Sequence, residues 1–188
     1  MYKKILVLVA AVLVAGALAA CGGSGSSSSG TTSIQAPKDS ISESRIFLTD
    51  AQEWGNEYIV VYAGKDTGAL TKVQDIVHFF QGGNVTREDL EAFDADSFFP
   101  SFSTLDFATK EIEEKSTTKE GAILEIKFTF DDLKNKEHLL KLHELGILTM
   151  EDTNADYLTA ESMCDMLLSK GDTEVESSER PGRGLPLL

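Results

Sequence analysis

The sequence predicts an α+β domain: an antiparallel sheet of four to six strands with two or three helices packed on one face. Three observations lead to this class. Apolar runs of strand length come in pairs joined by short turns. Capped amphipathic segments follow these pairs. The resulting order of strands, helix, strands and helices is typical of α+β domains.

The strand predictions rest on β-branched and aromatic runs that are bounded by turn residues. Such runs occur at residues 46–48, 58–63, 70–80, 107–116, 122–130 and 173–175. The charged run Lys110–Lys115 suits an edge strand, where charges oppose aggregation. Apolar and polar residues alternate most cleanly from Ala122 to Phe130. This alternation predicts one buried face, with Glu125, Lys127 and Thr129 on the other.

The helix predictions rest on capping residues at both ends. The expected N-caps are Thr86 (with Asp89 as its capping-box partner), Asn135 and Thr159. The expected ends are near Asp96, at Gly146 and at Gly171. The last helix would place Ala160, Met163, Cys164 and Leu167 on one apolar face.

The N-terminal residues have the pattern of an export signal. A short basic start, Met1–Lys4, precedes an unbroken apolar run at residues 5–20. This run is shorter than the roughly 20 residues that span a bilayer. It ends in the signal-peptidase recognition residues Leu18, Ala19 and Ala20. Because Cys21 follows directly, the segment resembles the lipobox of bacterial lipoproteins, which predicts cleavage before Cys21 and lipidation of its thiol.

The expected organisation therefore has four parts. Residues 1–20 form a cleaved signal peptide, 21–44 a lipidated cysteine with a flexible Gly/Ser-rich tether, 45–175 a single α+β domain, and 176–188 a disordered tail. Fatty acyl chains such as palmitate contribute roughly 0.8 kcal/mol per buried methylene, and two or more hold a protein stably on a membrane. We expect a lipid-anchored protein on the extracytoplasmic face of the cell membrane.

The charge balance excludes one class of partner. The chain carries 17 basic and 31 acidic residues, a net charge of −14. Cleavage before Cys21 would remove Lys3 and Lys4 and leave 15 basic residues, or −16. Such a domain is repelled by nucleic acid and by anionic headgroups. We therefore expect no nucleic-acid partner; membrane lipid would be contacted only through acylated Cys21.

Three segments resemble a known family. Residues 57–62, 124–131 and 159–175 are similar to the YehR-like small bacterial lipoproteins, a domain family of unknown function. The resemblance covers most of residues 45–175. It implies a lipid-anchored α+β domain and supplies no catalytic residues.

One acidic segment has the beginning of a cation-binding pattern. Asp152, Asn154 and Asp156 have the first three spacings of a calcium loop, but Tyr157 and Met163 stand where the loop needs glycine and glutamate. Turn formation is the favoured interpretation, with a weak exposed calcium site as the alternative.

The other chemical motifs have structural interpretations. Asp66-Thr67-Gly68 is one copy of a triplet that aspartic proteases need twice, and it suits a hairpin turn. His138 and His143 are five residues apart and so point to different helix faces. Cys164 lies on an apolar face, which favours core packing.

The residues thus predict a non-catalytic protein without a cofactor. It would be a lipid-anchored binding or accessory domain of the bacterial cell envelope, with an envelope protein or peptide as its partner. The alternative is a solute- or calcium-binding lipoprotein.

Overall fold

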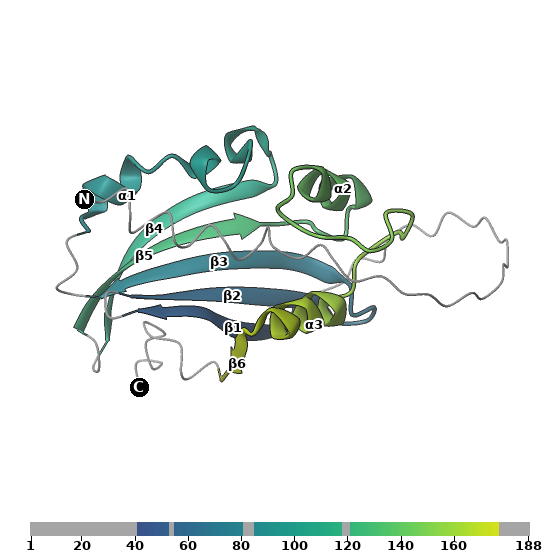
Figure 1. The fold of residues 1–188 in the computed structure, drawn as a ribbon, viewed down its shortest axis with the longest axis horizontal. Helices are drawn as coiled ribbons and strands as arrows, with labels where there is room; N and C mark the ends of the chain where they lie inside the picture. Colours follow the sequence, from purple (N-terminus) through teal and green to yellow (C-terminus); the bar gives the residue numbers. More distant parts are fainter. Residues whose placement is uncertain (1–40, 53–54, 81–84, 118–120, 177–188) are drawn as a thin grey trace, which may run out of the picture.

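A computed structural model describes residues 41–52, 55–80, 85–117 and 121–176. Its centre is a six-stranded antiparallel sheet in the order β4-β5-β3-β2-β1-β6 (Figure 1). The strands are β1 (Ile41–Gln52), β2 (Gly55–Gly64), β3 (Leu70–Phe80), β4 (Ala108–Thr117), β5 (Gly121–Phe130) and β6 (Thr173–Val175). The helices are α1 (Arg87–Glu91), α2 (Lys136–Glu144) and α3 (Ala160–Lys170), with short 3-10 turns at Ala95–Ser97 and Phe102–Thr104. The predicted α+β class is confirmed.

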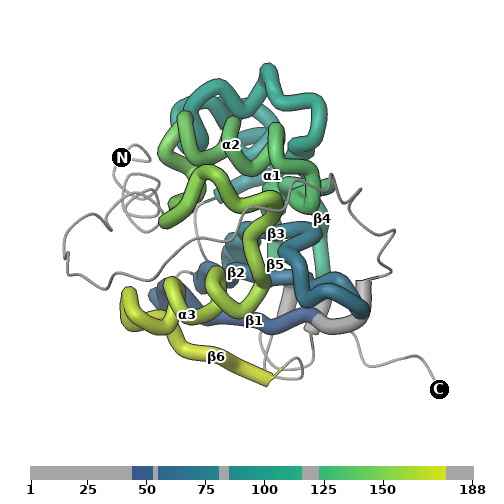
Figure 2. The backbone as a smooth tube through the Cα atoms, turned by 90° about the vertical axis from the view of Figure 1, so that its right-hand side faces the viewer, coloured from purple at the N-terminus to yellow at the C-terminus, as the bar shows by residue number. Residues whose placement is uncertain are grey.

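The helices lie on one side of the sheet, as Figures 1 and 2 show. The sheet side beneath them, the helix face, carries most of the core. Its buried residues include Phe47, Ile59, Val61, Val73, Val77, Phe79, Ile126, Phe128 and Phe130. Each such side chain contributes roughly 1.5–3 kcal/mol on leaving water. This face therefore fixes the helices and the loops between them.

The helix caps follow the sequence closely. The Thr86 side chain accepts from the backbone N–H of Asp89, and the Asp89 carboxylate accepts in return from the backbone N–H of Thr86. Asn135 and Thr159 cap α2 and α3 through their side chains. Gly171 ends α3 in the left-handed conformation. The predicted apolar face of α3 is confirmed, since all four of its residues are buried.

The first strand is longer than predicted. β1 begins at Ile41, so the sheet takes up the last residues of the segment 21–44 that was expected to be a tether. The reason is pairing rather than composition, because β1 pairs with β2 from Ile41 opposite Gly64 to Gln52 opposite Gly55. Backbone hydrogen bonds of this kind hold polar residues in a strand without an apolar pattern.

The first helix is shorter than predicted, ending at Glu91 rather than near Asp96. The Lys110 ammonium group donates to the carbonyls of Leu90, Glu91 and Phe93, and so satisfies the helix end from β4. The Asp94 side chain then caps a separate 3-10 turn. Lys110 was expected to be one of a set of solvated edge charges.

The expectation that β5 has a single buried face is wrong. Ile123 and Glu125 are both 0 % exposed, although they point away from the helix face. On this opposite face a second cluster contains Ile46, Tyr58, Val60 and Ile76, all buried. An alternating pattern reports which side chains share a face, and it does not report whether the second face is covered.

β6 closes the edge of the sheet beside β1. Val175 pairs with Ile46, and Thr173 with Leu48. The Arg45 guanidinium donates two hydrogen bonds to the Glu174 carboxylate, with Nε–Oε1 at 2.7 Å and Nη2–Oε2 at 2.8 Å. This bidentate pair lowers the pKa of Glu174. Across the described ranges, no helix is long and apolar enough to cross a membrane.

Candidate functional site

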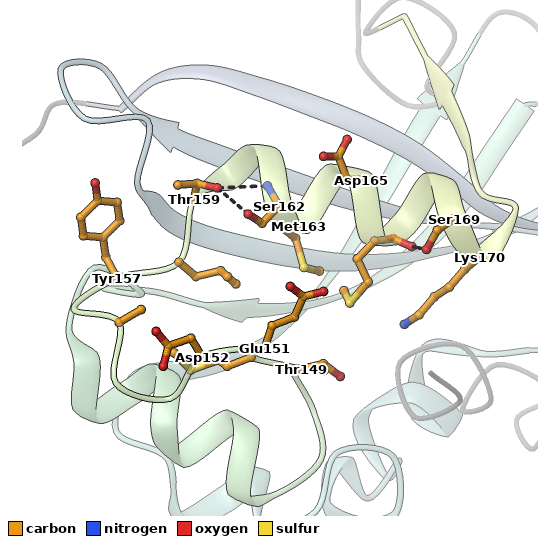
Figure 3. Close-up of a pocket in the computed structure, with 14 residues that line it drawn as sticks. Thr149, Glu151, Asp152, Tyr157, Thr159, Ser162, Met163, Asp165, Ser169 and Lys170 are labelled. Atoms are coloured by element: carbon orange, nitrogen blue, oxygen red, sulfur yellow. Dashed lines mark hydrogen bonds between the residues drawn. The ribbon is translucent and has the colours of Figure 1, made fainter. Parts of the chain in front are cut away.

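A cleft of about 950 Å³ lies between α3 and the segment 149–158, which links α2 to α3 (Figure 3). We call it the α3 cleft. It is lined by Thr149, Met150, Glu151, Asp152, Ala155, Tyr157, Leu158, Thr159, Ser162, Met163, Asp165, Met166, Ser169 and Lys170. Its volume is at the upper end of the range of ligand pockets, and it is open to solvent.

Both walls of the cleft are fixed to the rest of the domain. The backbone N–H of Ala160 donates to the carbonyl of Gly68, and that of Leu70 donates to the carbonyl of Leu158. These bonds hold the start of α3 against the turn between β2 and β3. The opposite wall is held by Lys136, whose ammonium group donates to the carbonyl of Asn154 at 2.7 Å.

The lining combines apolar side chains with carboxylates. Met150 and Met163 are 5 % and 2 % exposed and belong to the core, while Met166 is half-buried. Tyr157, at the mouth, is 46 % exposed. Figure 3 shows Glu151 pointing across the cleft toward α3, with Asp165 on the outer side of the helix and Lys170 at its C-terminal end.

Of the predicted cation-binding candidates, Asp152 lines this cleft, and Asn154 and Asp156 lie in the same segment 149–158 without lining it. The Asp152 carboxylate accepts from the backbone N–H of Asn154 at 2.8 Å, which is a turn-forming bond. The Asp156 carboxylate lies 3.8 Å from the ammonium group of Lys136. In the part of the chain that the structure describes, no three His, Cys, Asp or Glu residues are placed to hold a metal ion together. Asp152 thus makes the turn-forming bond that the sequence favours.

Two carboxyl groups are buried on the helix face of the sheet. Glu57 on β2 is 4 % exposed and Asp75 on β3 is 2 % exposed. Oε2 of Glu57 and Oδ1 of Asp75 are buried without a hydrogen-bond partner. Burial raises the pKa of Asp75 to about 7. Burial, and then the negative charge of Asp75, raises the pKa of Glu57 to about 10.

A third carboxyl group connects this pair with the end of α3. Asp172 follows the helix and is 9 % exposed, and burial raises its pKa while Lys170 opposes the shift. Asp172 in turn contributes to the raised pKa of Glu57. Lys170 lines the α3 cleft and interacts electrostatically with Asp172, which in turn interacts with Glu57. Charge interactions therefore connect the cleft with the buried pair.

The opposite face of the sheet carries a buried ionic network. Nε2 of His78 lies 2.6 Å from Oε2 of Glu125, and Nζ of Lys115 lies 2.8 Å from Oε1 of the same carboxylate. The His78 ring also contacts the Tyr58 ring, with 5.2 Å between centroids. Burial acts to raise the pKa of Glu125, but the hydrogen bonds from His78 and Lys115 outweigh it and lower this pKa to about 2.

The remaining predicted residues have structural positions. Asp66 lies in the turn between β2 and β3. The His138 ring stacks on Phe107, with 4.0 Å between centroids, and His143 Nδ1 accepts from the backbone N–H of Met150. Cys164 is fully buried, and burial raises the pKa of its thiol to about 11. The lipidation and cleavage residues at 18–21 lie outside the described residues.

Sequence reasoning missed the buried acids and His78. A signal for Asp75 was present, because Val73, Asp75, Val77 and Phe79 share one face of a period-two pattern. Glu57 similarly shares a face with Ile59 and Val61. A carboxyl group on an otherwise apolar face can be read from such a pattern. The cleft itself lies between adjacent segments of the chain, but its shape depends on backbone bonds that join Leu158 and Ala160 to the distant turn between β2 and β3.

No family model and no curated protein matches the chain. The chain is similar to two solved structures. One is the NMR structure of a protein from Streptococcus pneumoniae TIGR4, at 11 % identity and TM-score 0.39, covering 85 % of this chain and 100 % of that one. The other is the NMR structure of Escherichia coli YehR, at 17 % identity and TM-score 0.41, covering 78 % and 99 %.

Proposed function

We propose that this chain is a lipid-anchored, extracytoplasmic binding domain of the bacterial cell envelope, and that its ligand occupies the α3 cleft. The observation that carries the binding role is the cleft itself, an open cavity of about 950 Å³ with fixed walls and a mixed apolar and acidic lining. Ligand sites in proteins commonly have this size and this combination of side chains. We place the chain with the YehR-like lipoproteins on the residues at 57–62, 124–131 and 159–175.

The anchoring part of the proposal rests on the first 21 residues. A basic start, an apolar run too short to span a bilayer and small residues before Cys21 are what an exported lipoprotein needs. In bacterial cells fed labelled palmitate, we expect the chain to incorporate the label, and Cys21→Ala to abolish incorporation. Cys164→Ala, the matched control at the other cysteine, should leave it unchanged. Unlabelled wild-type protein would contradict the proposal.

Binding rather than catalysis is supported by where the titratable groups lie. The pair with raised pKa values, Glu57 and Asp75, is buried on the helix face, and neither residue lines the cleft. The lining carboxylates Glu151 and Asp165 are exposed on opposite walls. This arrangement suits recognition of a ligand by shape and charge.

A crosslinking experiment on intact cells tests the binding site. Tyr157 and Leu168 are the two large apolar side chains that are markedly exposed in the described ranges, at 46 % and 44 %. Tyr157 lines the cleft and Leu168 does not. A photoreactive amino acid at position 157 should capture a defined partner, and the same group at 168 should not. Equal capture at both positions, or capture of lipid alone at 157, would contradict the assignment.

A small solute or a calcium ion is the second candidate ligand. It is favoured by the exposed Asp152, which lines the cleft, and by the exposed Asp156 in the same segment. Calcium at millimolar concentration should then raise the melting temperature of the protein, because a ligand that binds only the folded state stabilises it. An unchanged melting temperature would remove calcium from consideration.

A further inference from the structure

We propose that the α3 cleft binds a basic peptide segment in an extended conformation. Its cationic side chains would lie beside Glu151 and Asp152, with Asp165 at the rim. Its apolar side chains would pack on the half-buried Met166 and on Tyr157. This inference rests on the proposed function and specifies the class of ligand. Three properties of the cleft support it: its length, its methionine lining and its charge.

The cleft is elongated along α3. Its lining includes Thr159, the N-cap of the helix, and Lys170, its last residue. At 1.5 Å per residue, this helix is about 16 Å long. An extended peptide advances about 3.3 Å per residue, so about five residues match the length of the wall. A single small cation would leave most of this volume empty.

Methionine is concentrated in the cleft. The chain has four methionines, and the three that follow Met1 (Met150, Met163 and Met166) all line this one cavity. Methionine side chains are flexible and polarizable, and surfaces that accept varied apolar side chains are rich in them. Tyr157 adds an exposed aromatic ring at the mouth. Met150 and Met163 are 5 % and 2 % exposed and lie beneath this surface, so Met166 and Tyr157 offer the accessible apolar contacts, which suit the apolar side chains of a peptide better than a strongly hydrated solute.

The charges of the cleft select a cationic partner. Three carboxylates and one ammonium group line it: Glu151, Asp152, Asp165 and Lys170. The C-terminal end of α3 adds the negative end of the helix dipole near Lys170. The chain as a whole has a net charge of −14, which also attracts basic ligands at long range and repels acidic ones. Complementary charge would therefore favour lysine- or arginine-containing segments.

The methionines also supply the measurement. We would label the methionine methyl groups of the lipidated protein with ¹³C in zwitterionic detergent micelles. Cleavage before Cys21 removes Met1, so the three remaining signals all report on the cleft. The probe is a five-residue peptide of alternating lysine and leucine with blocked ends. Glutamine and glutamate versions, and the polyamine spermine, serve as comparisons. We expect the lysine peptide alone to shift these signals in a saturable way, and more weakly as salt rises.

Charge-neutral substitutions test the carboxylates. The triple variant Glu151→Gln, Asp152→Asn, Asp165→Asn should weaken binding about five- to tenfold at low salt, which corresponds to exposed ion pairs of ordinary strength. The matched control removes three exposed acids elsewhere: Glu88→Gln, Asp106→Asn and Glu114→Gln. This control should bind as tightly as the wild type. The methyl spectrum without peptide shows whether each variant is folded.

The outcomes separate this inference from the proposed function. Equal shifts with the glutamine peptide or with spermine would overturn a basic peptide as the ligand and leave a binding cleft. Equal weakening in the control variant would overturn the role of the three carboxylates. If no peptide shifts the signals but position 157 still captures a partner on cells, the ligand class is wrong and the function stands. If neither experiment detects binding, both fail.

Discussion

Glu57 and Asp75 lie diagonally across the β2–β3 pair, on the helix face and among apolar side chains. Asp75 is opposite Ile59, and Glu57 is opposite Val77, so the two carboxyl groups share one face of adjacent strands. Asp75 also lies beside Phe128 of β5, whose ring contacts Phe98 and Phe99. Neither acid has an ion-pair partner among the described residues, and each has a buried oxygen without a hydrogen bond. The folded domain therefore favours their neutral forms.

This pair should make the domain less stable as the pH rises above 5. The pKa of Asp75 rises from 3.8 to about 7, and that of Glu57 from 4.5 to about 10. A raised carboxyl pKa gives stability that is full below the unfolded value and is lost as the pH rises through the folded value. Each proton that only the folded state retains changes the unfolding free energy by about 1.4 kcal/mol per pH unit. Urea unfolding at pH 5, 6, 7 and 8 measures the slope.

Other acids have lowered pKa values, and they determine how the stability of the domain changes at low pH. The pKa of Glu125 is lowered to about 2, and those of Asp89, Asp96 and Glu174 are also lowered. Stability from these groups is lost as the pH falls through their folded values, so it affects only the range below about 4.5. A domain whose stability is flat or rising between pH 5 and 8 would contradict the assignment to Glu57 and Asp75.

Neutral substitutions at the buried pair should stabilise the domain at alkaline pH. In Asp75→Asn and Glu57→Gln the side chain keeps its shape and loses the ability to ionise, so the cost of burying a charge is removed. We expect a higher urea midpoint than wild type at pH 8, a smaller difference at pH 5, and a flatter pH slope. Asp106→Asn, at an exposed position, is the control and should follow the wild-type slope. The idea fails if both variants keep that slope.

The sequence predicted the strands and caps because both depend on local patterns. β3 has the predicted bounds, and Thr86, Asn135 and Thr159 cap their helices through side-chain oxygens. Period-two alternation and capping bonds involve residues close together in the chain, so one sequence contains the whole signal.

The features that escaped prediction depend on contacts between distant residues. β1 extends to Ile41 because β2 pairs with it, and α1 stops at Glu91 where Lys110 satisfies its carbonyls. Glu125 is buried with His78, which is 47 positions away. The α3 cleft depends on the position of α3, which is fixed by the hydrogen bond from the backbone N–H of Ala160 to the carbonyl of Gly68 in the β2–β3 turn. None of these pairings has a local pattern that identifies its partner.

The His78–Glu125 pair should show strong energetic coupling. In His78→Leu the buried Glu125 carboxylate loses the hydrogen bond from His78 and keeps the one from Lys115. Breaking a buried pair in this way costs about 3–5 kcal/mol of unfolding free energy. Adding Glu125→Met removes the charge that was left unpaired. Lys115 can then remain beside Glu113, whose carboxylate lies 3.3 Å from its ammonium group. We expect the double variant to regain most of the loss.

A double-mutant cycle measures this coupling. The single and double variants are unfolded in urea at pH 7, and the interaction energy is the deviation from additivity. A buried pair should give a deviation of more than about 1 kcal/mol. The control is Lys127→Met. The ammonium group of Lys127 lies on the same face of the sheet as Glu125 but nearer the surface, so this variant measures the effect of removing a charge from that face. Additive effects of the two substitutions would show that the contact contributes no specific stability.

Gly55 and Gly68 should respond differently to alanine, because they are glycines for different reasons. A Cβ at Gly55 would lie 1.9 Å from the backbone oxygen of His78, which belongs to the adjacent strand and cannot move without separating β2 from β3. Gly55→Ala should therefore cost about 3 kcal/mol or more, in the range of severe core substitutions. Gly68 has open space around it but a φ of +67°, so Gly68→Ala should cost only about 1–2 kcal/mol. Its carbonyl would still accept from the backbone N–H of Ala160, so the α3 cleft should keep its shape.

Urea midpoints rank the two variants, and the methionine methyl signals report on the cleft. A larger loss of stability in Gly68→Ala than in Gly55→Ala would contradict the steric argument.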